Sequence, residues 1–197
     1  MSIIKKQNKN EKVDFMMKSN EIYELKCKIY KAYILKNYLI CIEVANCLVD
    51  KLNSENSNDK ESYWYVNYYK TLANGKLGNF EEAHKNALES LDYMKGNDIT
   101  KYSLSLMMLA VLKKQLGDIE KAKSLFFSLS RCFKKLGYIN LRIFCLFNLA
   151  CIKKDFTLIY RLIDITYGVS YNLNDGIEMD KNTLLDEMEA EFEKLEI

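Results

Sequence analysis

The sequence of 197 residues has no proline, only seven glycines and a single histidine. Proline and glycine mark most turns between short strands, so their scarcity argues against a protein built from strands and tight turns. Alanine, leucine, lysine and glutamate, which favour helices, are plentiful instead. The composition therefore predicts an all-α protein.

Long apolar runs are missing as well. Nowhere do about eighteen apolar residues follow one another, as a membrane-spanning helix requires. The opening MSIIKKQNKNEKVDF is basic but lacks the apolar stretch of a secretory signal. We therefore expect a soluble, cytoplasmic protein without a membrane partner.

The six cysteines form no CxxC pair and lie inside apolar runs, which is unlike a disulfide framework or a zinc site. We expect them to be buried thiols that behave as small hydrophobic side chains. They are Cys27, Cys41, Cys47, Cys132, Cys145 and Cys151.

Signals of catalysis are also absent. The histidine, His84, is expected at the surface of a helix, so serine and cysteine nucleophiles lack their usual base. No P-loop, GxSxG or GxGxxG spacing occurs. The acid pairs Glu81–Glu82 and Glu189–Glu191 are expected on solvated helix faces. We therefore predict a protein that is not an enzyme and that binds no metal or cofactor.

Charge is unevenly distributed along the chain. The formal net charge is only +2, which gives no reason to expect a nucleic-acid partner. Residues 175–197, however, hold nine acidic residues and two lysines, a net charge of −7, so residues 1–174 carry +9. A moderately basic body thus precedes an acidic tail.

What the sequence does contain is a repeat. Residues 76–83 read KLGNFEEA and residues 115–122 read QLGDIEKA. Two weaker copies with the same pattern lie at residues 35–41 and 153–159. Each copy places a helix-capping residue before a bulky apolar one, and Gly78 and Gly117 are expected to end the preceding helix in the left-handed conformation. The predicted caps are Asn37, Asn79, Asp118 and Asp155, and the bulky residues are Tyr38, Phe80, Ile119 and Phe156.

Small or apolar residues follow each bulky residue three and seven positions later, as on the buried stripe of a helix. The pattern predicts units of helix, tight turn and helix. The bulky residues lie 42, 39 and 37 positions apart. Helix pairs repeated at such intervals stack into a solenoid, because one pair cannot bury its own apolar face.

The expected organisation has three parts. Residues 1–20 form a basic segment that we expect to be partly flexible, and residues 21–172 form the repeat domain. Residues 177–197 form an acidic amphipathic helix, which either caps the solenoid or docks on a partner or on the basic groove of this chain. The four units are predicted at about 21–55, 62–95, 100–136 and 138–172.

The run LMMLAVLKKQLGDIEKAKSLFFSL resembles a tetratricopeptide repeat. The residues that match its signature are Leu106, Leu109, Ala110, Leu116, Gly117, Ala122, Phe126 and Leu129. The resemblance implies a right-handed α-α solenoid of about four helix pairs that binds a partner on its concave face. The intervals exceed the usual length of about 34 residues and no unit has a closing proline. These departures resemble the repeats of bacterial peptide-pheromone receptors of the Rap and PlcR groups.

The first helix of each pair lines the concave face of such a solenoid. Tyrosines there offer broad contact area with a polar tip, which suits an extended peptide or a partner helix, although tyrosines at helical spacing also pack between helices. The resemblance gives Asn148 a role in pairing with the backbone of a bound peptide. The predicted inward residues are Tyr23, Lys26, Tyr30, Tyr65, Tyr68, Leu72, Met107, Val111, Lys114, Leu141, Phe144 and Asn148.

The sequence thus predicts an adaptor or regulator that binds a peptide or protein, with a signalling peptide as one candidate ligand. The receptors that it resembles carry a DNA-binding domain or a helical bundle before their repeats, and neither is seen here. We therefore expect a stand-alone adaptor or a shortened relative that competes for a peptide or partner. The alternative is a structural protein that self-associates, with a homodimer as one candidate form, and whose groove is filled by its own tail helix or a second copy.

Overall fold

A computed structural model describes residues 20–168, 181–193 and 195. In this part of the chain α-helices and the turns between them are the secondary structure. None of these helices combines the length and the apolar character that crossing a membrane requires. The predicted basic segment up to residue 19, the end of the fourth unit and the start of the acidic helix lie outside the described residues.

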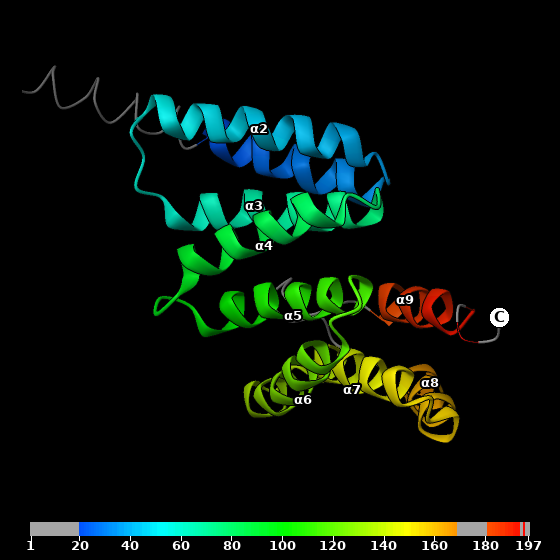
Figure 1. Cartoon of the computed structure of the whole chain (residues 1–197). Coiled ribbons are helices and arrows are strands. Elements are labelled where there is room, and N and C mark those ends of the chain that lie inside the picture. The colour runs from blue at the N-terminus through cyan, green and yellow to red at the C-terminus, as the bar shows by residue number, and fades with distance from the viewer. Residues whose placement is uncertain (1–19, 169–180, 194, 196–197) are drawn as a thin grey trace, which may run out of the picture. The chain divides into compact units, whose positions relative to one another are not determined.

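The chain divides into two compact units, Met1–Asp98 and Ile99–Ile197. In the first unit, a helix over residues 20–34 is followed by α2 (Tyr38–Ser54), α3 (Lys60–Lys76) and α4 (Phe80–Met94). Short turns fold α2 back along the first helix and α4 back along α3 (Figure 1). The first unit is therefore two antiparallel helix pairs, and α2 packs against α3 to join them.

The second unit begins with α5 (Ile99–Gln115) and α6 (Ile119–Leu136), followed by α7 (Ile139–Lys153) and α8 (Phe156–Gly168). These again form two antiparallel pairs, joined by packing between α6 and α7 (Figure 1). A last helix, α9 (Lys181–Glu193), packs against α7 and α8. The described chain is thus an all-α protein of repeated helix pairs, as the octets predict, whereas the handedness of a solenoid stays a prediction.

All four pairs share one turn geometry. The residue before each predicted cap has a positive φ: Lys36 59°, Gly78 78°, Gly117 83° and Lys154 54°. The next N–H donates to the carbonyl five residues earlier in every copy, for example Asn79 to Asn74 at 2.9 Å and Asp155 to Ala150 at 3.0 Å. This is a Schellman ending, which satisfies carbonyls that the helix leaves unpaired. The first and fourth turns adopt it with a lysine where the other two use glycine.

The predicted caps stand at the N-cap positions, but most of them do not make the side-chain hydrogen bond expected of a cap. Asn37, Asn79 and Asp118 occupy the N-cap positions of α2, α4 and α6, yet none makes a side-chain capping hydrogen bond. Asp118 instead pairs with Lys121 at 3.0 Å, which lowers its pKa. Only Asp155 caps as predicted, accepting from the N–H of Leu158 at 3.0 Å. The Schellman bonds satisfy carbonyls of the preceding helix, whereas the first N–H groups of α2, α4 and α6 receive no side-chain cap.

The residues predicted for the buried stripe of each second helix do lie inside. Seven of the eight are buried and Ile163 is half-buried. The buried seven are Cys41, Ala45, Ala83, Ala87, Ala122, Phe126 and Ile159. Small residues at this position let two helices approach closely, which explains why the octet repeats an alanine. The helix pairs thereby hold the first helices, and the side chains predicted for binding, in fixed orientations.

Candidate functional site

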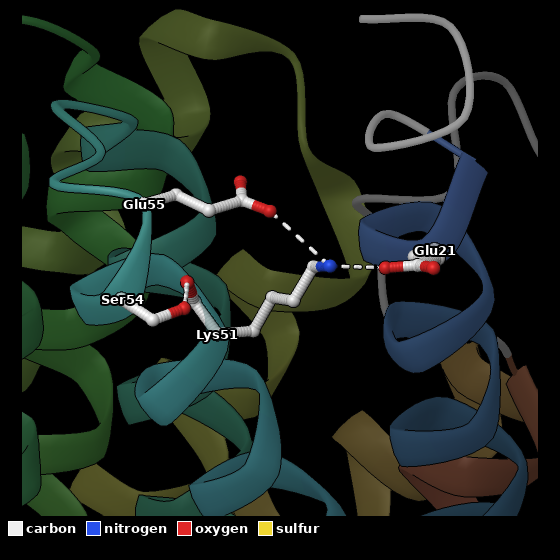
Figure 2. A network of polar contacts seen from close by, with 4 residues as sticks. All are labelled: Glu21, Lys51, Ser54 and Glu55. Carbon is white, nitrogen blue, oxygen red and sulfur yellow. Dashed lines mark hydrogen bonds and ion pairs between the residues drawn. The ribbon is translucent and has the colours of Figure 1, made fainter. Parts of the chain in front are cut away.

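In the first unit an ion-pair network at the surface links the helix over residues 20–34 to α2. Lys51 on α2 reaches Glu21 on that helix and Glu55 just after α2, the latter at 3.2 Å (Figure 2). The hydrogen bonds from Lys51 to Glu21 and Glu55 raise the pKa of the lysine. Ser54 donates to the carbonyl oxygen of Lys51 at 2.8 Å and so orders the end of α2. The network adds to the buried packing of Ile29 and Ala32, which joins the helix that carries Tyr23, Lys26 and Tyr30 to the core of the unit.

Five tyrosines form a cluster between that helix and α3, which we call the tyrosine cluster: Tyr30, Tyr33, Tyr65, Tyr68 and Tyr69. Tyr69 lies at its centre, with ring centroids 6.3 Å from Tyr30, 5.6 Å from Tyr33 and 4.7 Å from Tyr65. Rings at such separations attract one another in edge-to-face or tilted pairs. The cluster therefore holds the first helices of two successive pairs side by side.

Polar contacts accompany the tyrosine cluster. The hydroxyl of Tyr65 donates to the backbone carbonyl of Lys26 at 3.0 Å, and the ammonium of Lys26 lies 5.7 Å from the Tyr65 ring centroid. Burial raises the pKa of Tyr65 and of Tyr69 above the usual range. These hydroxyls stay neutral in the physiological range and act as hydrogen-bonding groups.

The sequence prediction and the structure overlap here only in part. Tyr30, Tyr65 and Tyr68 belong to the cluster and Lys26 lies beside it, so the alternative of tyrosines that pack between helices is observed here, and a binding role stays a prediction. Tyr69 and Tyr33 were not among the predicted residues. Tyr23 is 66% exposed and Tyr30 is 52% exposed, so they offer free aromatic surface. Leu72 is half-buried. The signal for Tyr69 was its place four residues after Tyr65, on one face of α3.

In the second unit three side chains from three helices meet around one ammonium group. We call these residues the Lys114 site: Lys114, Asn148 and Glu191. The ammonium of Lys114 on α5 donates to Asn148 Oδ1 on α7 at 2.7 Å and to Glu191 Oε1 on α9 at 2.6 Å. The side chain of Lys114 is only 10% exposed and that of Glu191 20%. A lysine so withdrawn from water needs a charged or polar partner, because desolvating an unpaired ammonium costs several kcal/mol.

Asn148 lies at the base of this site and is only 3% exposed. Its amide oxygen accepts from Lys114, and its amide nitrogen donates to the backbone carbonyl of Phe144 at 3.0 Å. The two bonds fix the orientation of the amide and place its oxygen beside the lysine. Pairing of Asn148 with the backbone of a bound peptide stays a prediction, and such pairing requires these internal bonds to be replaced.

The helix that supplies Glu191 is seated by apolar contacts. Leu184, Leu185 and Met188 of α9 are buried. The ring of Phe192 contacts two rings of α8, at 5.4 Å from Tyr160 and 6.5 Å from Phe156. These side chains recur every three or four residues, so one face of α9 is covered along the described helix.

Polar contacts tie α9 to the end of α8. The hydroxyl of Tyr167 donates to Glu189 Oε1 at 2.9 Å, and Lys181 donates to the carbonyl oxygen of Tyr167 at 2.7 Å. The hydroxyl of Thr166 lies 3.8 Å from the sulfur of Met188. The apolar seat and these bonds fix α9 so that Glu191 meets Lys114.

The other residues predicted for the inner face of the second unit are less accessible. Met107, Leu141 and Phe144 are buried and Val111 is half-buried. Burial of apolar side chains stabilises the unit by roughly 1.5–3 kcal/mol each, so packing accounts for these three residues in the described state. Of this predicted set, Lys114 and Asn148 are joined by a hydrogen bond between side chains of two different helices.

The structure corrects three further expectations. Glu191 is not on a solvated helix face, because it lies with Leu184 and Met188 on the covered side of α9 and pairs with Lys114. Cys27 and Cys47 are exposed, whereas Cys41, Cys145 and Cys151 are buried and Cys132 is half-buried. His84 is half-buried rather than at an open surface. In each case helical position alone did not reveal what the neighbouring helix covers.

Two results bear on chemistry and relatedness. Among the described residues, no group of three or more His, Cys, Asp or Glu side chains is arranged to hold a metal ion. No protein-family model matches this sequence, and no curated protein matches it. The resemblance to tetratricopeptide repeats and to pheromone receptors therefore stays a prediction that rests on the residues of the repeat.

Proposed function

We propose that this chain is a non-catalytic binding protein that takes a peptide or protein partner on the first helices of its pairs. The observation that carries the proposal is the Lys114 site, where Lys114 on α5, held by Asn148 on α7, binds the carboxylate of a separate helix. Both residues belong to the set that the repeat pattern predicts to face a partner. A surface that already holds α9 has the chemistry to hold an external segment.

The first unit supports the same proposal with different chemistry. Tyr23 and Tyr30 are mostly exposed, and Lys26 lies beside the tyrosine cluster. Exposed tyrosines next to a cation are typical of surfaces that bind peptides, since the rings give area and the hydroxyls give direction. The proposed location is the cytoplasm, where the free thiols of the six cysteines suit a reducing environment.

A second candidate function is structural. In it, α9 is a permanent cap that completes the second unit, and the chain serves as a scaffold or self-associates. The burial of Leu184, Leu185 and Met188 favours this reading, since a solenoid needs a lid over its last apolar face. The two functions differ in one measurable respect: only the first requires binding that depends on the inner residues.

The test is selection of peptide binders from a displayed random library against the full-length chain, followed by affinity measurements on variants. We expect selected peptides to lose at least tenfold in affinity on Tyr23→Ala with Tyr30→Ala, or on Lys114→Met. Phe127→Ala is the matched control, because Phe127 on the second helix α6 is also mostly exposed. Circular dichroism checks that each variant keeps its helicity. Failure to select any binder, or binding that neither variant weakens, contradicts the proposal and favours the structural function.

A further inference from the structure

We propose that the partner of the Lys114 site is an acidic amphipathic helix of another protein, and that α9 is an internal copy of this ligand. The inference rests on the proposed function and names its partner by chemistry. It starts from the fact that the Lys114 site is occupied, because α9 shows which chemistry fits.

Charge is the first argument. Residues 99–168, which form α5–α8, hold twelve Lys and Arg against four Asp and Glu, a net charge of +8. Residues 181–193, which form α9, hold one Lys against five acidic residues, a net charge of −4. Opposite charge accelerates encounter and disfavours basic competitors. An acidic segment is therefore the favoured occupant of this unit.

Shape is the second argument. Leu184, Leu185, Met188 and Phe192 form the contact face of α9 against α7 and α8, and Glu191 adds a carboxylate beside that face. Residues at these intervals share one face only when the segment is helical. An extended peptide spaces its side chains differently, so it cannot place four apolar groups and one carboxylate on the same sites.

The two arguments define a sequence pattern for the partner. Counted from Leu184, apolar side chains stand at the first, second, fifth and ninth positions and a glutamate stands at the eighth. Helix-in-groove recognition commonly uses such anchors. The carboxylate supplies specificity, because leaving Lys114 desolvated and unpaired is costly.

An internal ligand also sets how strongly a partner binds. Because α9 belongs to the same chain, its effective concentration is high and a free helix competes poorly against it. Weakening α9 in the full-length chain should therefore strengthen binding of an external helix.

The probe is a fluorescein-labelled synthetic peptide of residues 181–197, titrated by fluorescence anisotropy into the full-length chain at low salt. The receptor variant is Glu191→Lys in the full chain, which opposes the ammonium of Lys114 with a second cation. We expect the peptide to bind this variant at least tenfold tighter than the wild-type chain. A peptide with the same residues in scrambled order tests whether charge alone is sufficient.

A charge swap makes the test specific to Lys114. On the full-length chain that carries Glu191→Lys, two peptides are compared. The peptide with Glu191→Lys should bind at least tenfold more weakly than the native peptide does. A full-length chain carrying Lys114→Glu and Glu191→Ala should reverse that preference. Lys135→Glu combined with Glu191→Ala is the control receptor, because exposed Lys135 on α6 changes the net charge equally without touching the Lys114 site.

The inference is overturned if the native peptide binds neither chain, if the scrambled peptide binds equally, or if the swap does not reverse the preference. It is also overturned if the wild-type chain is a dimer that Glu191→Lys dissociates, because the second copy is then the occupant. The proposed function survives separately if library peptides depend on Tyr23 and Tyr30 but ignore Lys114. It fails separately if no library peptide binds.

Discussion

A left-handed residue precedes the cap in all four turns, but two of the turns use lysine. Lys36 and Lys154 have φ of 59° and 54°, close to the values of Gly78 and Gly117 in the same role. A side chain in this conformation costs roughly 1–2 kcal/mol because its Cβ crowds the following carbonyl. The first and fourth turns are therefore strained where the second and third are not.

Replacing Lys154 by glycine should stabilise the protein by roughly 0.5–1 kcal/mol, since the relief of strain exceeds the entropy that glycine loses on folding. The measurement is the free energy of unfolding in urea. Lys153→Gly, one residue earlier and still in α7, is the matched control and should destabilise by about 0.5–1 kcal/mol. Equal effects of the two substitutions would contradict the assigned turn geometry.

Asp59 is the N-cap residue of α3. Its Oδ1 accepts from the N–H of Ser62 at 3.0 Å, and its other oxygen binds the Ser62 hydroxyl. Burial alone would raise the pKa of Asp59, but the hydrogen bonds from Ser62, the charge of Lys26 and the backbone N–H of Glu61 together outweigh it and the pKa is lowered. The ionised carboxylate is therefore favoured by folding.

Asp59→Ala should cost about 1 kcal/mol at pH 7. Because the folded-state pKa is below the unfolded one, this contribution is complete above the unfolded pKa, near 4, and disappears as pH falls through the folded value. Urea unfolding of the wild type and the variant from pH 7 to pH 2.5 measures it. Asn37→Ala, at a cap without a side-chain bond, is the control and should change stability by less than about 0.5 kcal/mol at every pH. A wild-type advantage that persists at pH 2.5 would contradict the account.

At the scale of the element, the sequence was sufficient to predict the helix boundaries that depend on residues close together in the chain. Each turn is encoded by residues that touch one another along the chain, so the starts of α2, α4, α6 and α8 were predicted. The capping bonds were not predicted correctly, because an asparagine or aspartate can stand at the cap position whether or not its side chain accepts from the first N–H groups, and the residue pattern is the same in both cases. Local patterns thus fix where helices end but not which groups do the bonding.

The residues of the Lys114 site were less predictable, because one of them is brought in by a helix that is distant in sequence. Lys114 and Asn148 follow from the repeat register, but Glu191 is 77 positions from Lys114 in sequence. Its spacing of three from Met188 was compatible with the covered face, yet acidic residues on helices are usually solvated. Only the placement of α9 against α7 and α8 brings the carboxylate to the lysine. Contacts between distant elements decide this site.

At the scale of the whole molecule, the solvent exposure of the six thiols shows which parts of each unit are packed. Cys27 and Cys47 are exposed on the two helices of the first pair, and Cys132 is half-buried on α6. Burial raises the pKa of Cys41 and of Cys151 to about 11, and it raises that of Cys145 further. A thiol reacts as the thiolate, so a buried, neutral thiol is slow for two reasons.

We therefore expect a maleimide at pH 7 to modify Cys27 and Cys47 first, Cys132 more slowly, and Cys41, Cys145 and Cys151 only on unfolding. Mass spectrometry of peptides after timed labelling identifies each site, and labelling in urea gives the rate for an open chain. The double variant Cys27→Ser, Cys47→Ser is the control and should lose the fast phase while keeping its unfolding midpoint, because both side chains face solvent. Fast labelling of Cys145 or Cys151 in the native protein would mean that the packing of α7 is open, and the Lys114 site would then lack the rigid base that Asn148 provides.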